Sequence, residues 1–168
     1  TRIATIDSFV TLFILYAYFF MFRYLLLDPF RASLRNKLVP LALSGLMMGF
    51  AIASKWPGIY AGAGLAVLFF ANLIRVMLDA YRLHSATDQE LDALGEDSVL
   101  ARELGRRWLL EPIRICLWCL LFFIAVPLVI YYLSYIPVYI ASPGGLTIEK
   151  VIGNNIYMFG YHSKPGFG

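Results

Sequence analysis

Charged residues are scarce in this sequence. Asp and Glu together number 11 and Lys and Arg number 14, so that 15% of the chain is charged while 60% is hydrophobic. With a mean hydropathy of +0.71, this composition lies outside the range of soluble globular domains. The net charge of +3 is small and belongs to the loops, which excludes a nucleic-acid-binding protein.

Cysteine and histidine are also rare, at two residues each. Cys116 and Cys119 form a single C-x-x-C pair, a spacing that can indicate redox chemistry or zinc. Both lie in an apolar segment, where cysteine behaves as a small buried hydrophobe, and no second pair or nearby histidine completes a zinc set. We interpret them as packing residues and predict no metal and no cofactor.

Long apolar runs, in contrast, are abundant, and blocks of charge separate them. A membrane-spanning helix needs roughly 20 apolar residues. We predict an all-α polytopic membrane protein, a single membrane domain over residues 1–168, with about four transmembrane helices and short interfacial helices. The predicted spans are 6–27, 38–54, 57–78 and 113–135, with a polar loop over 79–112 and an interfacial tail over 137–168.

The second and third spans meet at a tight bend over residues 54–58, where proline ends one helix and suits the first turn of the next. Two Gly-x-x-x-Gly pairs, Gly45/Gly49 and Gly58/Gly62, predict surfaces on which another helix packs closely. Pro127 predicts a kink within the fourth span.

Several local predictions concern helix ends and surface helices. Thr5 is the expected N-cap of the first helix, which would place Asp7 in its first turn. Thr87-x-x-Glu90 resembles a capping box. The acidic residues near Glu90 are interpreted as a solvated face. The loop helices are expected to place four side chains on their membrane side: Leu91, Leu94, Leu104 and Trp108. A helix in the tail is expected to carry four apolar side chains on one face: Val151, Ile152, Ile156 and Phe159.

The basic residues predict the orientation in the membrane. Four spans place residues 23–38 and 75–114 on one surface, and these regions hold ten of the 14 Lys and Arg residues, the others being Arg2, Lys55, Lys150 and Lys164. Because basic loops stay on the cytoplasmic side, the Lys55 hairpin and the C-terminal tail are expected on the outer side.

Four segments together resemble bacterial protein O-mannosyltransferases, relatives of the dolichyl-phosphate-mannose–protein mannosyltransferases in the GT-C superfamily. In chain order they are RIATIDSF, SKWPGIYAGAGLAVLFF, PLVIYYLSYIP and NNIYMFGYHS, and the resemblance covers nearly the whole chain from Thr1 to Ser163. It implies a GT-C-type helix bundle in the bacterial cytoplasmic membrane that transfers mannose from polyprenyl-phosphate-mannose to Ser or Thr hydroxyls of proteins at the outer face. The implied partners are this lipid-linked donor, the acceptor protein and membrane lipid.

The family's catalytic carboxylate belongs to an Asp-Glu pair in a first outer loop, upstream of the stretch that matches residues 2–7. The sequence opens at Thr1, without a signal-peptide pattern, and does not contain that loop. We therefore expect an internal fragment that is inactive alone, with no catalytic residue of its own.

Candidate site residues gather on the predicted outer side. Arg2 and Lys55 are candidates for binding the donor phosphate, although basic residues at helix ends can also simply reach the interface. Asp7 could orient Arg2 or the acceptor, or only favour the helix dipole. Trp56 and Tyr60 could line the lipid or sugar path, or only belong to an aromatic belt.

The last two candidates, Tyr161 and His162, could bind sugar or acceptor, or anchor the tail at the surface. Two other readings stay open for the chain as a whole. One is a GT-C transferase with a glycan or lipid acceptor. The other is a non-catalytic membrane subunit or transporter fragment, which the placement of charges at helix ends disfavours because transporters place them near the midplane.

Overall fold

The computed structural model describes residues 2–93, 95–139 and 147–162. Three long helices come first: α1 (Arg2–Leu25), α2 (Leu34–Ser54) and α3 (Gly58–Ser85). A fourth long helix consists of α6 (Leu110–Leu120), the π-helical η2 (Leu121–Ala125) and α7 (Val126–Ser134). These four are long and apolar enough to cross a membrane, and the described residues include no strand, which confirms the all-α polytopic membrane fold.

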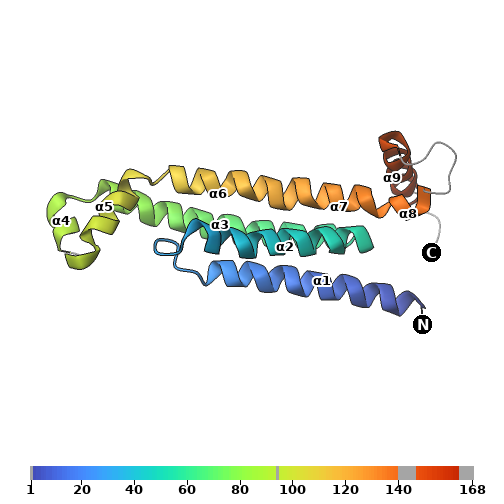
Figure 1. Cartoon of the computed structure of the whole chain (residues 1–168), viewed down its shortest axis with the longest axis horizontal. Helices are drawn as coiled ribbons and strands as arrows, with labels where there is room; N and C mark the ends of the chain where they lie inside the picture. The colour runs from blue at the N-terminus through green and yellow to red at the C-terminus, as the bar shows by residue number, and fades with distance from the viewer. Residues whose placement is uncertain (1, 94, 140–146, 163–168) are drawn as a thin grey trace.

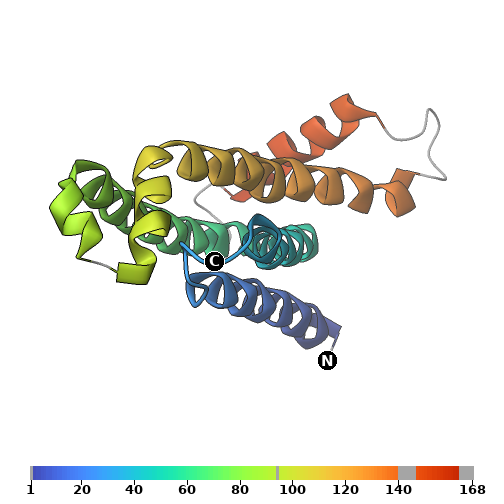
Figure 2. The ribbon, with the colours of Figure 1, turned by 60° about the vertical axis from the view of Figure 1, so that its left-hand side comes forward.

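Short helices lie at the two ends of this bundle (Figure 1). The charged end carries the 26–33 loop, α4 (Asp88–Asp92), η1 (Gly95–Asp97) and α5 (Ser98–Arg106). The hairpin end carries the start of α1, the α2–α3 turn, α8 (Ile136–Tyr139) and α9 (Ile148–His162). A view turned by 60° shows the long helices side by side along one direction (Figure 2).

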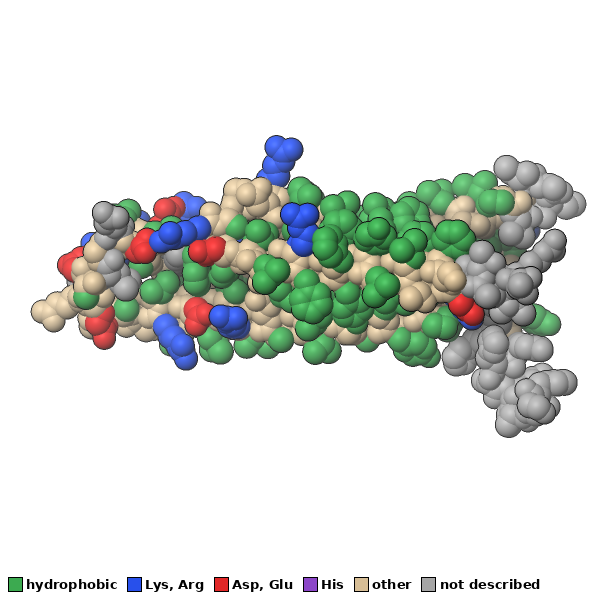
Figure 3. All heavy atoms as spheres, turned by 90° about the horizontal axis from the view of Figure 1, so that it is seen from below, with side chains coloured by type: hydrophobic (Ala, Val, Ile, Leu, Met, Phe, Trp, Pro, Cys, Tyr) green, Lys and Arg blue, Asp and Glu red, His purple; other side chains and the backbone are tan. Residues whose placement is uncertain are grey.

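Charged side chains lie mainly at the ends of the bundle, as expected for helices that cross a membrane. The visible face in Figure 3 is apolar along its middle, and most acidic and basic side chains gather at the charged end. There, Arg31 Nη2 donates to both carboxylate oxygens of Asp97, at 2.7 and 2.9 Å. This contact joins the first loop to the polar loop, so both lie at one end of the bundle as predicted.

The start of α1 differs from the prediction. The helix begins at Arg2, so Thr5 is a helical residue and not the N-cap, and Asp7 lies beyond the first turn. The apolar Ile3, Ala4 and Ile6 continue the helix without a breaker. Asp7 therefore does not owe its position to the helix dipole, whose effect is confined to the first turn.

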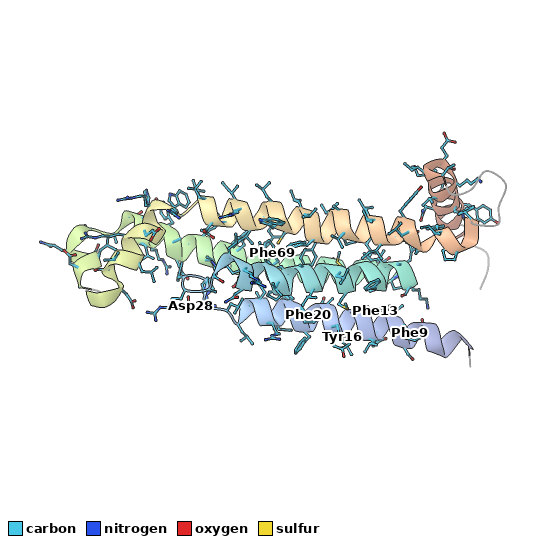
Figure 4. The ribbon with its side chains drawn as sticks, in the orientation of Figure 1. Phe9, Phe13, Tyr16, Phe20, Asp28 and Phe69 are labelled. Carbon is cyan, nitrogen blue, oxygen red and sulfur yellow. The ribbon has the colours of Figure 1, made fainter. Side chains whose placement is uncertain are left out.

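Close packing of α1, α2 and α3 rests on small residues and two side chain–backbone hydrogen bonds. Ser44 is fully buried and donates to the Ala17 carbonyl at 2.8 Å, and Tyr18 donates to the Ala61 carbonyl at 3.2 Å. Figure 4 shows Phe9, Tyr16 and Phe20 along α1 and Phe69 towards the interior, where it is 5% exposed.

The Gly45/Gly49 pair contacts the fourth long helix, as the close-packing prediction requires. A methyl group on Gly45 would lie 2.8 Å from the carbonyl carbon of Phe122 and nearer still to its oxygen. A methyl group on Gly49 would lie 2.7 Å from Ile130 Cδ1 and 3.2 Å from Pro127 Cα. At Gly45 only a hydrogen atom leaves room for the facing backbone, whereas at Gly49 the nearest atom belongs to a side chain.

A π-helical turn, η2, directly precedes the segment with Pro127, where the sequence predicts a kink. Proline has no N–H and its ring disfavours a regular preceding turn. The Val126 N–H donates to the Leu121 carbonyl, five residues back. The Phe122 carbonyl thus loses its ordinary amide partner, and it is this carbonyl that faces Gly45.

The polar loop folds against the extension of α3. The predicted capping box is present at Thr87 and Glu90. The Thr87 N–H and the Thr87 hydroxyl each donate to Glu90 Oε2 at 2.8 Å, and these hydrogen bonds lower the pKa of Glu90. His84 Nδ1 lies 2.8 Å from the Gly105 carbonyl, and Trp108 packs against Tyr81 and His84.

The apolar faces predicted for the polar loop and for the tail helix are not those found in the structure. Leu91 is buried in the protein, so its expected membrane-side position is wrong, whereas the side chains of Leu94 and Leu104 lie outside the described part. In α9 the buried Val151 does not share a face with the exposed Ile152 and Ile156. Val151 instead faces the protein with Asn155, four residues later. Phe159 lies outside the described side chains.

Candidate functional site

The α2–α3 turn is held closed by its glycine. The Lys55 backbone is extended, Pro57 precedes the first residue of α3, and the Gly58 N–H donates to the Lys55 carbonyl at 3.0 Å. A Cβ at Gly58 would lie 2.6 Å from the Ala51 carbonyl carbon. The turn therefore fixes Lys55 and Trp56 at the tip of the hairpin, as the sequence predicts.

Lys55 forms a salt bridge with Asp7 of α1. Lys55 Nζ lies 2.6 Å from Asp7 Oδ1, and the two side chains are 48% and 51% exposed. Residues 48 positions apart are thus joined at the hairpin end. The sequence singles out both residues, but it connects Asp7 with Arg2, not with Lys55. Arg2 opens α1, and its side chain lies outside the described part.

An apolar groove of about 710 Å³ lies beside this hairpin, between α3 and the fourth long helix. We call it the α3/α7 groove. Met48 and Ile52 of α2 contribute to its lining, and Trp56 belongs to it from the hairpin. The small residues Gly62 and Ala66 of α3 face the groove, opposite side chains such as Phe123 and Leu128. Its shape and chemistry suit a long hydrocarbon chain.

Hydroxyl and amide groups are concentrated at one place on this lining, Tyr131 of α7 and Asn155 of α9. Tyr131 Oη donates to Asn155 Oδ1 at 2.6 Å and lies 2.9 Å from Tyr135 Oη. Asn154 donates to the Tyr139 hydroxyl at 2.6 Å. Neutral hydroxyl and amide groups therefore meet the apolar groove.

The sequence analysis does not single out Tyr131, Tyr135, Asn154 or Asn155 as candidate site residues. The feature that could have identified the two amides is a pair of adjacent asparagines in a helix that follows the tyrosine-rich end of the fourth span. An amide at that position can satisfy a buried tyrosine hydroxyl, which needs a partner away from water.

The remaining candidates are distributed differently. Trp56 lines the α3/α7 groove, whereas Tyr60 is 76% exposed and does not. Tyr161 and His162 are the last two residues of α9, and their side chains lie outside the described part. Cys116 and Cys119 are free and line the groove, with Cys119 buried. No group of three or more His, Cys, Asp or Glu side chains among the described residues could hold a metal ion.

Comparison with known proteins adds one match. The family model described as dolichyl-phosphate-mannose-protein mannosyltransferase matches residues 1–138, which include α1 to α7 and the hairpin. Neither the curated proteins nor the solved structures gave a match. The match covers well over half of the 168 residues.

Proposed function

Because the chain belongs to the dolichyl-phosphate-mannose-protein mannosyltransferase family, we propose that it acts in mannose transfer from polyprenyl-phosphate-mannose to Ser or Thr hydroxyls of proteins. The match over residues 1–138 is the observation that carries this proposal. Membership makes the chain part of a membrane mannosyltransferase of the GT-C type. The particular carrier, the acceptor hydroxyl and the outer-face reaction belong to the proposal.

In this proposal the chain binds and positions the donor. The α3/α7 groove takes the polyprenyl chain, because its lining is apolar and one of its residues, Trp56, follows Lys55 directly. Lys55 binds the donor phosphate, since an ammonium has three donors and Asp7 occupies one of them. Arg2, on the helix that carries Asp7, is the second candidate for the phosphate.

The acceptor hydroxyl needs a base, and a cation has to stabilise the departing phosphate. Asp7 is engaged with Lys55, so we assign it to positioning Lys55 and not to catalysis. We assign the base to the Asp-Glu pair of the family's first outer loop, which residues 1–168 do not contain. The chain alone is then inactive, and no metal or cofactor is required from it.

The proposal is tested by measuring mannose transfer to a Ser/Thr-containing acceptor protein in membranes. We expect transfer from polyprenyl-phosphate-mannose when the protein carries the Asp-Glu loop, and no transfer from the present chain alone. Transfer to a glycan or lipid acceptor but not to protein would favour the alternative GT-C reading. Binding of neither donor nor acceptor would favour a non-catalytic subunit.

The groove assignment gives a separate prediction for Ala66→Phe. A phenyl group there would displace roughly two methylene contacts of a bound chain, at about 0.8 kcal/mol each, which raises the donor KM about tenfold. Val67→Phe is the matched control, because Val67 is 68% exposed on the same helix and does not line the groove. Equal donor KM values for the two variants would contradict the assignment.

A further inference from the structure

A second cavity lies at the charged end, on the opposite side of the membrane domain from Lys55. It has a volume of about 220 Å³ and is bounded by the 26–33 loop, α2, α3 and the α5–α6 junction. Its lining is mixed, with Lys37, Asn72 and Glu111 among apolar side chains such as Leu73 and Ile115.

Lys37 is the unusual residue of this cavity. Its side chain is only 9% exposed, and its Nζ lies 3.9 Å from Glu111 Oε2, which is beyond hydrogen-bond distance. The other cation of the lining, Arg107, already pairs with Glu103 at 3.3 Å. Lys37 and Glu111 therefore form a separated pair, and the Lys37 ammonium faces the cavity with no closer carboxylate among the described residues.

Lys37 lies near the charged end of the spanning part of α2. Lys37 precedes Ser54, the last residue of α2, by 17 positions, which at 1.5 Å each is about 26 Å along a hydrocarbon core of about 30 Å. Lysines at this level usually extend to water. The Lys37 side chain instead lines the cavity, where an anionic group can reach its ammonium.

We propose that this cavity binds the headgroup of an aminophospholipid, with its phosphate at Lys37 and Asn72 and its primary ammonium at Glu111. A ligand with both charges completes the separated pair, whereas a purely anionic headgroup would meet the carboxylates of Glu111 and Glu103. A choline headgroup has no N–H to donate to Glu111. The apolar side chains around the polar ones suit the adjoining glycerol and acyl carbons, and the site does not depend on the proposed transferase function.

The test measures lipid retention on the purified protein by native mass spectrometry after reconstitution with phosphatidylethanolamine, phosphatidylglycerol or phosphatidylcholine. We expect phosphatidylethanolamine to be retained preferentially. Lys37→Met should weaken that retention at least about tenfold, as expected for loss of a charge-assisted hydrogen bond. Glu111→Gln should shift the preference towards phosphatidylglycerol. Arg35→Met is the matched control, because Arg35 is exposed two residues earlier on α2, and its retention should match the wild type.

Two results would overturn the proposal: equal retention by the wild type and Lys37→Met, or equal retention of the three lipids by the wild type. Soluble glycerophosphoethanolamine distinguishes a free headgroup from a lipid, since competition at equal concentration would refute a lipid site. If Lys37→Met does not fold, Lys37→Arg keeps the charge, and Glu111→Gln alone tests the lipid preference; an unchanged preference in Glu111→Gln contradicts the proposal.

Discussion

Gly45→Ala is expected to destabilise the protein by about 3 kcal/mol, at the upper end of the range for an overpacked interior. The added methyl group would lie 2.8 Å from the Phe122 carbonyl carbon and nearer still to its oxygen. Backbone cannot turn aside as a flexible side chain does, so α2 and the fourth long helix would have to separate. That separation would also disturb the contact of α2 with η2 and α7.

The clash is severe because of the sequence around Pro127. Proline removes the amide that a π-helical turn would offer to Phe122, and Val126 donates to Leu121 instead. The Phe122 carbonyl is therefore directed at α2, where the Cα of Gly45 can approach it and form a weak C–H···O contact. A methyl group at Gly45 would remove this contact and would also fill the space that the carbonyl oxygen occupies.

The measurement is the midpoint of thermal or denaturant-induced unfolding in detergent, followed by tryptophan fluorescence. Gly49→Ala should have a smaller effect, since the nearest atom is the mobile end of Ile130. Gly153→Ala is the control: no atom lies within 4 Å of its added methyl group, and alanine favours a helix over glycine by up to about 1 kcal/mol. A Gly45→Ala protein as stable as Gly153→Ala would contradict the packing argument.

The sequence predicts the features that depend on composition and spacing. Apolar length locates the four spanning helices, and the Gly45/Gly49 spacing predicts a close helix contact because small residues permit it. Arg31 and Asp97 lie at one end because an even number of spans separates their loops. Each of these follows from local pattern and alternation across the membrane, which do not require knowledge of which side chains meet.

Partners across helices could not be predicted in the same way. Asp7 is a plausible first-turn carboxylate until the helix is seen to begin at Arg2, and only the packing of α1 against α2 brings it to Lys55. Tyr131 and Asn155 belong to segments separated by a long connection. The sequence also does not predict the burial of Lys37, because a lysine near the start of a helix ordinarily reaches water.

Lys55→Met is expected to raise the donor KM roughly ten- to a hundredfold, if Lys55 binds the donor phosphate as proposed. A hydrogen bond to a charged group contributes about 1.5–3 kcal/mol, which corresponds to that range. The change in protein stability should be small. Lys55 and Asp7 are each about half exposed, and exposed ion pairs contribute only about 0–1 kcal/mol.

The pairing with Asp7 supplies a control that separates binding from structure. The double variant Asp7→Lys/Lys55→Asp restores a salt bridge between α1 and the hairpin but places a carboxylate where the phosphate would bind. If Lys55 only holds the hairpin, this double variant recovers the wild-type donor KM. If Lys55 binds phosphate, it is at least as impaired as Lys55→Met, because like charges repel.

Asp7→Asn completes the comparison. It leaves the ammonium of Lys55 in place but removes its 2.6 Å partner, so donor KM should rise less than in Lys55→Met. Steady-state mannose transfer at varied donor and fixed acceptor concentration, in the protein that carries the Asp-Glu loop, gives all four KM values. An unchanged donor KM in Lys55→Met, with unfolding midpoints equal to the wild type, would refute the assignment of Lys55 to the phosphate.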